Sequence, residues 1–549
     1  MLWTRACAVR EHPGPARVLT RNGQRTVLRL LAALAIGALL GAACQSGPAP
    51  EPVSTEARVT ATATAASSAA ASRPPAGGTL RVGIAGEIGL LDPGSNDAST
   101  EPILRQLYEG LVERVGDRMV GRLATKWAVA ADGRTWTFTL REDVRFHDGS
   151  PLDAAAAAAS LTRPIGRGLT GDEVIESATA TGPLALAVIT RTPFAPFLSL
   201  LGTPRYAIVR TKVATVGTGP FRLPEGGATV RPLVLERNPE YWRTDAAGNR
   251  LPYLDRVIVR AYPDAAARVA ALRSGAVDLV TEIPIADVAT VRADPSLQLV
   301  TRPPTTVLSL AMNLGQPPLD DLQVRQAIAA AVNRRALVDR LLAGEGRPAT
   351  QLLPPGILGH DDSILEFTRN DPAAAKKLLA QAGKTTLEID LWYVLGAPAS
   401  RPDARRVAES IAADLAAVGV TANLRTIDPV TFGLAVRESR YPLWIDSTAL
   451  ASGDPDEVLG RLFIPPVLDG KDQPTAGGAW VDREAAGLLR KARAEPDESK
   501  RSELYKQVSK IVQQQLPRVP LVWSAAPAAA TKKVIDPLAF WTGAAAIGK

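Results

Sequence analysis

Apolar and polar positions follow two different periods along this chain, which indicates a mixture of strands and helices. Residues 78–85 (GTLRVGIA) form a short run rich in strand-forming residues. In 127–142 (WAVAADGRTWTFTLRE), apolar residues alternate with threonines after Asp132-Gly133, a pair that favours a hairpin turn. We therefore expect a strand at 78–85 and a β-hairpin over 127–142.

Two later stretches have the period and the end signals of helices. In 370–383, Asp371 can cap the first turn, a proline follows it, and Gly383 suits the left-handed position after the last turn. The stretch 403–419 repeats this pattern and ends at Gly419, before the strand-like run VTANLRTI. Strands that alternate with helices predict an α/β fold with more than one lobe.

The N-terminal region has the pattern of an export signal. A basic stretch that ends at Arg29 precedes an unbroken apolar run over 30–43. Fourteen residues are too few to span a bilayer comfortably, but they suit the core of a signal peptide. We therefore interpret 1–43 as a signal peptide.

The chain contains two cysteines, Cys7 and Cys44. Cys44 follows LLGAA, which resembles the lipoprotein box in which a cysteine is acylated after cleavage, although Gly41 stands where that box usually has leucine. The alternative is ordinary cleavage after Ala43, which leaves a free thiol. We favour lipid attachment at Cys44, and loss of Cys7 with the signal excludes an intrachain disulfide.

Composition separates a linker from a nearly neutral body. Residues 44–76 are dominated by Pro, Ala, Ser and Thr and lack aromatics, which predicts a disordered tether that ends near Gly77. The chain has 549 residues, 46% hydrophobic residues and a net charge of +7. Six arginines and one acid lie in 1–43, which leaves a net charge of +2 for the remainder. This balance gives no electrostatic case for nucleic-acid binding.

A set of motifs along the body resembles the family 5 extracellular solute-binding proteins, the receptors of peptide, nickel and related ABC importers. The motifs are GGTLRVG (77–83), LLDP (90–93), YEGLV (108–112), the hallmark stretch LATKWAVAADGRTWTFTLREDVRFHDGSPLDA (123–154), GTGPF (217–221), ERNPEYW (236–242), MNLGQPPLDDLQVRQAIAAAVNRRALV (312–338) and LYKQVSKIVQQQLPRVPLVW (504–523). The number and order of these motifs carry the resemblance, since each alone is weak.

The resemblance implies a two-lobed periplasmic-binding-protein-like fold with an extra subdomain in lobe I, and a ligand held between the lobes. It implies a monomeric, exported receptor without a cofactor, which delivers a solute to permease subunits and their ATPases. The expected parts are lobe I at 77–108, 215–305 and 516–549, its subdomain at 109–214, and lobe II at 306–515. A ligand that contacts both lobes would stabilise the closed form.

His147, in VRFHDGSP, could be a metal ligand, a general base or a structural residue. In the family that this chain resembles, the FHDG stretch is structural. We expect VRFHDG to end a strand, Asp148-Gly149 to form a turn, and Asp153 to cap a helix over 154–160. We therefore expect His147 to bond nearby backbone, and no metal site, because the other histidines are His12 in the signal and His360, alone in a loop.

The sequence contains no G-x-S-x-G elbow, no G-x-x-x-x-G-K-[ST] loop and no H-E-x-x-H helix. We therefore expect no catalytic residues, and assign ATP hydrolysis to the partner complex. A secreted hydrolase remains the alternative from another class.

A peptide is the leading ligand, because most recognised members of the resembled family bind peptides. In those relatives an aspartate soon after a tryptophan in lobe II holds the ligand ammonium, and some place a carboxylate-binding arginine in a loop before a lobe II helix. Here Asp446 follows Trp444 one position early, Asp454 is the second acid, and Arg401 lies in that loop.

Asn313 completes the candidate ligand-binding residues. Chelated nickel, an oligosaccharide or an opine remain alternative ligands, since one fold hosts many ligands on altered pocket residues.

Overall fold

The fold is that of a computed structural model, which describes part of the chain. The described residues are 77–94, 99–116, 118–163, 174–211, 215–396, 401–437, 440–465, 467–468, 471–472, 480–543 and 548. They fall within one unit of the chain, Ser72–Lys549. The predicted signal peptide, Cys44 and the predicted linker lie outside the described residues.

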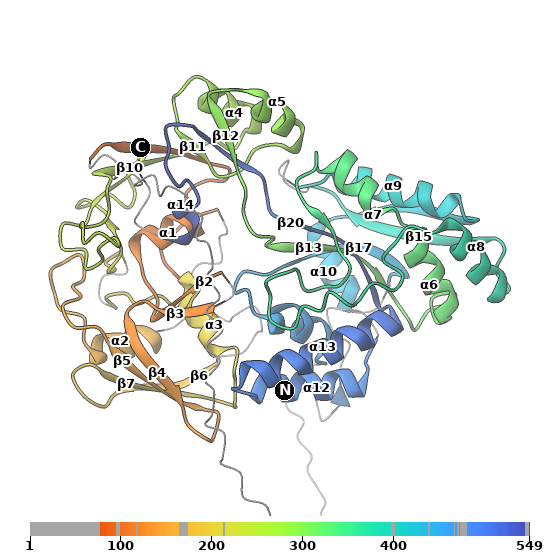
Figure 1. Ribbon diagram of the computed structural model, residues 1–549, viewed down its shortest axis with the longest axis horizontal. Helices are drawn as coiled ribbons and strands as arrows, with labels where there is room; N and C mark the ends of the chain where they lie inside the picture. Colours follow the sequence, from red (N-terminus) through yellow and green to blue (C-terminus); the bar gives the residue numbers. More distant parts are fainter. Residues whose placement is uncertain are drawn as a thin grey trace, which may run out of the picture. The chain divides into compact units, whose positions relative to one another are not determined.

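The first lobe is built on a seven-stranded sheet, as counted over the described residues. The strand order is β12 (Leu297–Val300), β21 (Ala528–Thr531), β11 (Leu279–Val280), β1 (Thr79–Ile84), β10 (Arg256–Ala261), β9 (Leu233–Arg237), β8 (Phe221–Arg222). One core joins this sheet to α1 (Glu101–Leu107) and α14 (Ala539–Thr542). A second core joins it to α4 (Ala265–Arg273) and α5 (Val288–Ala293), which follows the short helix η2 (Ile285–Asp287). Figure 1 shows α4 and α5 beside β11 and β12.

The second lobe is built on a six-stranded sheet within the same described part of the chain. The strand order is β14 (Arg347–Pro348), β20 (Arg518–Ser524), β13 (Thr306–Met312), β17 (Leu443–Ala449), β15 (Leu387–Val394), β16 (Val420–Ile427). The largest apolar cluster packs one face of this sheet against α6 (Leu322–Ala331), η3 (Leu337–Leu341), α8 (Pro372–Gln381) and α9 (Ala404–Ala416). The short helix α7 (Arg334–Ala336) precedes η3.

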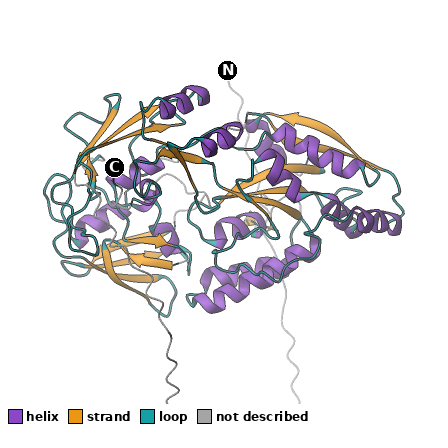
Figure 2. Cartoon of the chain, turned by 45° about the horizontal axis from the view of Figure 1, so that its top comes forward, coloured by secondary structure: helices purple, strands orange, loops and turns teal. Residues whose placement is uncertain are grey.

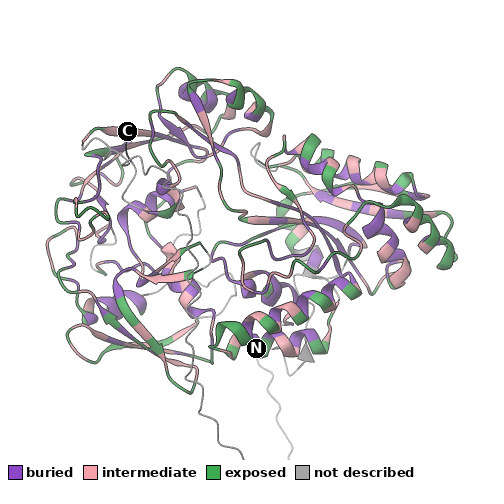
Figure 3. Cartoon of the chain, viewed as in Figure 1, coloured by how far each residue is buried: buried purple, intermediate pink, exposed green. Residues whose placement is uncertain are grey.

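The opposite face of the second sheet carries two smaller clusters. One contains residues of η4 (Asp456–Gly460), α11 (Arg461–Phe463), α12 (Arg483–Ala494) and α13 (Glu498–Gln515). The other contains residues of α10 (Pro429–Arg437). A separate pair of short strands is formed by β18 (Val467–Leu468) and β19 (Lys471–Asp472). Helices therefore cover both faces, and Figure 3 shows buried residues along the strands between them.

A subdomain is formed by an antiparallel sheet of four described strands. The strand order is β4 (Ala124–Val129), β5 (Thr135–Leu140), β7 (Ala185–Thr190), β6 (Ile175–Ala180). Its core includes α2 (Ala154–Leu161), α3 (Phe197–Leu201) and residues of η1 (Pro204–Tyr206). The hairpin of β2 (Val112–Val115) and β3 (Arg118–Gly121) lies beside α3. Figure 2 shows the strands of this subdomain grouped together.

Most of the local predictions are confirmed. β4 pairs with β5 as the predicted hairpin, and Asp132 accepts backbone hydrogen bonds from the two residues after the turn glycine. Asp371 caps α8 and Asp403 caps α9, while Gly383 and Gly419 have φ of +68° and +93°. The α/β prediction is therefore confirmed.

One local prediction is wrong. VRFHDG does not end a strand, because β5 stops at Leu140 and the later segment makes only an isolated bridge from Arg145 to Pro151. The turn itself is present, since Gly149 N donates to Phe146 O at 2.8 Å. The segment therefore forms a turn with hydrogen bonds to its own backbone, and does not pair with a neighbouring strand.

The residue bounds of the lobes remain predictions. β20, which follows the expected boundary near residue 516, pairs with β13 and β14 of the second lobe. β21 pairs with strands of the first lobe. None of the described helices combines the length and apolarity needed to cross a membrane.

Candidate functional site

Two chain segments connect the lobes within the described residues. The chain leaves the first lobe at 301–305, between β12 and β13, and returns at 525–527, between β20 and β21. Thr305 N donates to Ser524 O at 3.0 Å, so the two connections lie side by side. Adjacent short connections of this kind are typical of a hinge between two lobes.

A cavity of about 550 Å³ lies where the two lobes meet. Residues 284–286 and Ala289 line it from the first lobe. The second lobe contributes four arginines, which are Arg340, Arg401, Arg405 and Arg406. The acid that lines the cavity, Asp403, caps α9. The guanidinium of Arg405 contacts Glu409 at 2.9 Å. The surplus of guanidinium groups suits a ligand that carries a carboxylate or another anion.

Arg401 is therefore the predicted site residue that the structure places at the lobe junction. Its side chain is exposed and it lies in the loop before α9. The exposed position leaves its guanidinium accessible to a solute in the cavity.

Asp446 lies on β17, opposite Ser309 of β13. Its Oδ2 accepts a hydrogen bond from Nη1 of Arg518 at 2.7 Å, and its Oδ1 accepts one from Ser447 N at 2.8 Å. The Arg518 side chain is fully buried, while that of Asp446 is 23% exposed. The carboxylate therefore already balances a buried positive charge, yet one side of it reaches solvent.

Trp444 is 1% exposed and belongs to a buried aromatic cluster. It lies in register with Trp392 of β15, whose ring centroid is 4.4 Å from that of Tyr441. The indole N–H groups of both tryptophans are buried without a hydrogen-bond partner. The structure therefore places Trp444 in the second lobe's core, beneath more accessible aromatic residues.

Asn313 and Asp454 also occupy buried positions. The side-chain oxygen of Asn313 accepts a hydrogen bond from Gly315 N at 3.1 Å, which stabilises the turn after β13. Asp454 forms an ion pair of 2.6 Å with Arg501 and accepts a hydrogen bond from Asp456 N at 3.0 Å. These contacts give both residues structural roles.

His147 forms two hydrogen bonds that connect the subdomain to the GTGPF loop (217–221) of the first lobe. Gly217 N donates to Nδ1 at 3.3 Å, so Nε2 carries the proton and donates to Gly219 O at 3.0 Å. Burial lowers the pKa of His147 to about 4. The bond that Nδ1 accepts from Gly217 needs the neutral ring, which supports the structural interpretation of this residue.

The shifted pKa of His147 predicts a loss of stability in mild acid. The unfolded chain takes up a proton near pH 6.5 and the folded protein near pH 4, so stability falls as pH falls through this window. We expect a loss of roughly 3 kcal/mol from this residue, measured by urea unfolding at pH 7 and pH 4. His147→Asn should show a smaller loss, and equal losses in the two proteins would contradict the assignment.

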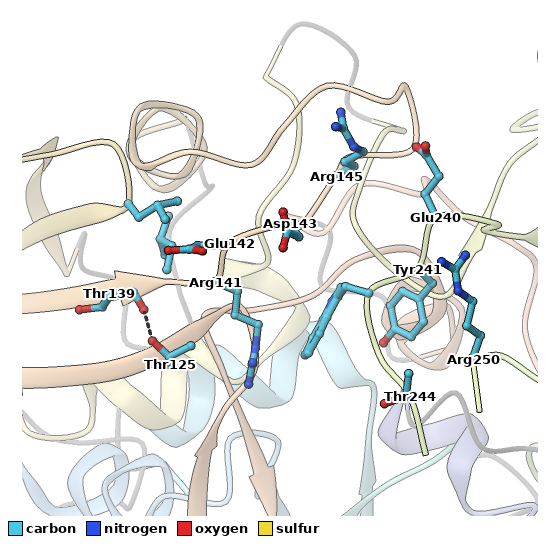
Figure 4. A pocket seen from close by; sticks show the side chains of 13 residues that line it. Thr125, Thr139, Arg141, Glu142, Asp143, Arg145, Glu240, Tyr241, Thr244 and Arg250 are labelled. Atoms are coloured by element: carbon cyan, nitrogen blue, oxygen red, sulfur yellow. Dashed lines mark hydrogen bonds between the residues drawn. The ribbon is translucent and has the colours of Figure 1, made fainter. Parts of the chain in front are cut away.

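A second cavity, of about 830 Å³, lies between the subdomain and the loop that follows β9. Figure 4 shows Arg141, Asp143 and Arg145 on the subdomain side and Tyr241 and Arg250 on the other. It contains none of the predicted site residues, and all of its lining belongs to the first lobe and its subdomain. Its place away from the second lobe separates it from the lobe junction.

Sequence reasoning missed the partner of Asp446 and the aromatic residues around Trp444. One signal was available for Arg518, since this arginine stands inside the apolar run LPRVPLVW and a buried arginine needs an acid. Among the described residues, no group of three His, Cys, Asp or Glu side chains is placed to hold a metal ion.

Two α/β lobes joined by paired connections define a binding protein of the periplasmic type, which encloses its ligand between the lobes. A family model described as "Bacterial extracellular solute-binding proteins, family 5 Middle" matches residues 118–466. The chain belongs to this family, which confirms the predicted resemblance. Proteins of the family are extracytoplasmic transport receptors that serve ABC importers.

Individual relatives agree with this assignment. The chain is 30% identical to the dipeptide-binding protein of Escherichia coli, over 80% of this chain and 88% of that protein. It is 28% identical to heme-binding protein A of Haemophilus influenzae, over 79% of this chain and 84% of that protein. The solved structure of HbpA2 from Haemophilus parasuis has a TM-score of 0.73 at 27% identity and covers 83% of this chain and 96% of its own.

Proposed function

We propose that this protein captures a peptide between its two lobes and delivers it to the permease of an ABC importer. The observation that carries the proposal is the arginine-lined cavity at the junction of two hinged lobes. Membership of the family and the dipeptide-binding relative support it. The protein acts as an exported monomer, and its partner complex hydrolyses ATP.

Arg401 and Asp446 are the proposed ligand contacts. The guanidinium of Arg401 suits a peptide carboxylate, and the exposed side of Asp446 suits an ammonium group, since a carboxylate has acceptor sites beyond those used by Arg518 and Ser447. Trp444, Asn313 and Asp454 are not included, because their side chains are buried in other contacts.

Mass spectrometry of the small molecules that co-purify with the protein tests the proposal directly. A peptide released on denaturation, and rebound in a calorimetric titration, is the expected result. A non-peptide ligand would contradict the peptide assignment and leave the receptor class intact. Turnover of peptides or esters by the purified protein would contradict the receptor assignment itself.

One observation favours a second ligand class. Asp446 already neutralises Arg518, whereas four arginines line the cavity. A solute with several carboxylates and no ammonium group would match this charge pattern, as a metal carried by a polycarboxylate chelator does. Calorimetric titrations with a dipeptide and with its N-acetylated form separate the two classes, since only a peptide receptor should prefer the free ammonium.

Replacing Arg401 with alanine should weaken ligand binding by about ten-fold or more, because a charge-assisted contact to the carboxylate is lost. The measurement is calorimetric titration with the co-purified ligand. Arg369→Ala is the matched control, since Arg369 is also exposed and also lies two residues before a capping aspartate. Equal affinities in the two variants would remove Arg401 from the site.

Acylation of Cys44 after cleavage of the signal should place the protein in membrane fractions. The pattern that motivates this proposal is the apolar run that ends in GAAC. Cys44→Ala should release the body into the soluble fraction, which cell fractionation and mass spectrometry of the N-terminus can measure. A wild-type protein that is already soluble and carries no lipid would refute the lipid attachment.

A further inference from the structure

The subdomain is tied to the first lobe by buried polar contacts. Glu109 forms an ion pair of 2.6 Å with Arg122. Glu109 also accepts hydrogen bonds from Tyr241 and Trp242, which follow β9 of the first lobe, at 2.9 and 3.0 Å. With the bonds of His147 to the GTGPF loop, these contacts hold the subdomain in place. The subdomain must therefore move with the first lobe when the hinge bends.

The same subdomain also contacts the second lobe, far from the hinge in sequence. Ser199 Oγ donates to Oδ2 of Asp454 at 3.0 Å. Arg114 bridges the two parts, because its Nε donates to Ser452 O and its Nη2 to Ser199 Oγ, both at 3.1 Å. Ala195 N donates to the backbone carbonyl of Arg493 at 2.6 Å. Three hydrogen bonds among the described residues thus cross from the subdomain to the second lobe, and the bond between Arg114 and Ser199 lies within the subdomain.

The second-lobe side of this contact is held rigidly. Arg501 pairs with Asp454, and Arg493 contacts Asp456 at 2.7 Å. Burial raises the pKa of Asp454, but the charge and hydrogen bond of Arg501, together with hydrogen bonds from Asp456 and Ser199, outweigh it, and the pKa lies below its ordinary value. Asp454 therefore stays charged and accepts the Ser199 bond strongly.

Gly453 fits this close approach. It has a φ of +68°, and a Cβ atom added there would lie 2.8 Å from Nε of Arg114. A side chain at position 453 would therefore push the guanidinium away from its backbone acceptor, besides straining the backbone.

We propose that Arg114, Ala195 and Ser199 of the subdomain form a latch with Ser452, Asp454 and Arg493 of the second lobe, and that this latch holds the lobes together without any help from the ligand. Bending at the hinge breaks the latch and exchanges its hydrogen bonds for hydrogen bonds to water. The latch sets the ratio of closed to open molecules, and so the apparent affinity for any solute. The latch residues are positioning residues, since they act through lobe closure. The inference rests on the proposed function only in that the lobes open and close around a solute.

Single-molecule fluorescence energy transfer on the ligand-free protein tests the latch. Dyes at Glu225→Cys in the first lobe and Lys384→Cys in the second, both exposed positions, report the distance between lobes in a Cys44→Ala background. We expect a predominant short-distance population in the otherwise unaltered protein. Ser199→Ala should raise the ratio of open to latched molecules roughly ten-fold, the size expected for loss of a hydrogen bond to a charged acceptor. Gly453→Ala should shift the ratio in the same direction from the other side.

Ser160→Ala is the matched control. It removes a buried serine hydroxyl from the same subdomain, where its hydrogen bonds to Ala207 and Val209 stay inside the subdomain. This variant should leave the distance distribution unchanged. The latch is refuted if the ligand-free protein is already open, if Ser199→Ala and Gly453→Ala leave the ratio unchanged, or if Ser160→Ala shifts it equally. None of these readouts needs the identity of the solute, so a failed peptide assignment does not affect them.

Discussion

Replacing Asp446 with asparagine should destabilise the second lobe by about 3 kcal/mol and weaken peptide binding by roughly two orders of magnitude. The stability loss arises because Arg518 has no exposed side-chain surface, and the substitution removes the carboxylate that pairs with its buried charge at 2.7 Å. The affinity loss arises because the ligand ammonium loses its counter-charge when the lobes exclude water. Urea unfolding and calorimetric titration with a co-purified peptide measure the two effects.

A double variant separates these two roles. Asp446→Asn combined with Arg518→Met removes both charges, and an apolar replacement of a buried pair is often neutral for stability. The double variant should regain stability and remain defective in peptide binding. Normal affinity in both the single and the double variant would show that Asp446 serves Arg518 alone.

Replacing Glu109 with alanine should lower the free energy of unfolding by about 3–5 kcal/mol. Its side chain is 1% exposed and serves several buried donors at once. These donors are Arg122 Nε at 2.6 Å, Tyr241 OH and Thr218 Oγ1 at 2.9 Å, and Trp242 Nε1 at 3.0 Å. Removing one acid would leave all four groups without this acceptor in the junction between subdomain and first lobe. Thermal and urea unfolding followed by circular dichroism measure the loss.

Glu113→Ala provides the comparison for Glu109. Glu113 also pairs with Arg122, but its side chain is 20% exposed and it has a second partner, Arg243. Because Glu113 is partly exposed, water can replace part of its contacts with Arg122 and Arg243. The loss of unfolding free energy should therefore be clearly smaller than in Glu109→Ala. Equal losses in the two variants would show that burial of Glu109 does not control the stability of this junction.

Helices α8 and α9 and the β4–β5 hairpin could be predicted because their determinants are local. An aspartate cap, a glycine after the last turn and an apolar period all lie within one element, so a short window contains the information. The family could also be predicted, because its motifs occur in a fixed order along the chain. The strand expected at VRFHDG was wrong because a strand needs a partner, and no local signal shows whether one is present.

The candidate site depended far more on the tertiary structure. Arg401 was singled out because some dipeptide-binding relatives place a carboxylate-binding arginine in this loop, yet only the fold brings residues 284–286 of the first lobe to it. Asp446 was predicted from its place soon after Trp444, with no partner foreseen. The fold pairs it with Arg518, 72 positions away. Asp454 was a second ligand candidate, and the fold buries it in a contact with Ser199 and Arg501.

The sequence by itself thus determined most of the local elements and the family, because hydrogen bonds within a turn and the apolar period depend on neighbouring residues. Only the tertiary structure decided which charged side chains are accessible to a solute. Ion pairs and cavities form between segments that are distant in the chain, and whether a side chain is accessible depends on every segment that packs against it.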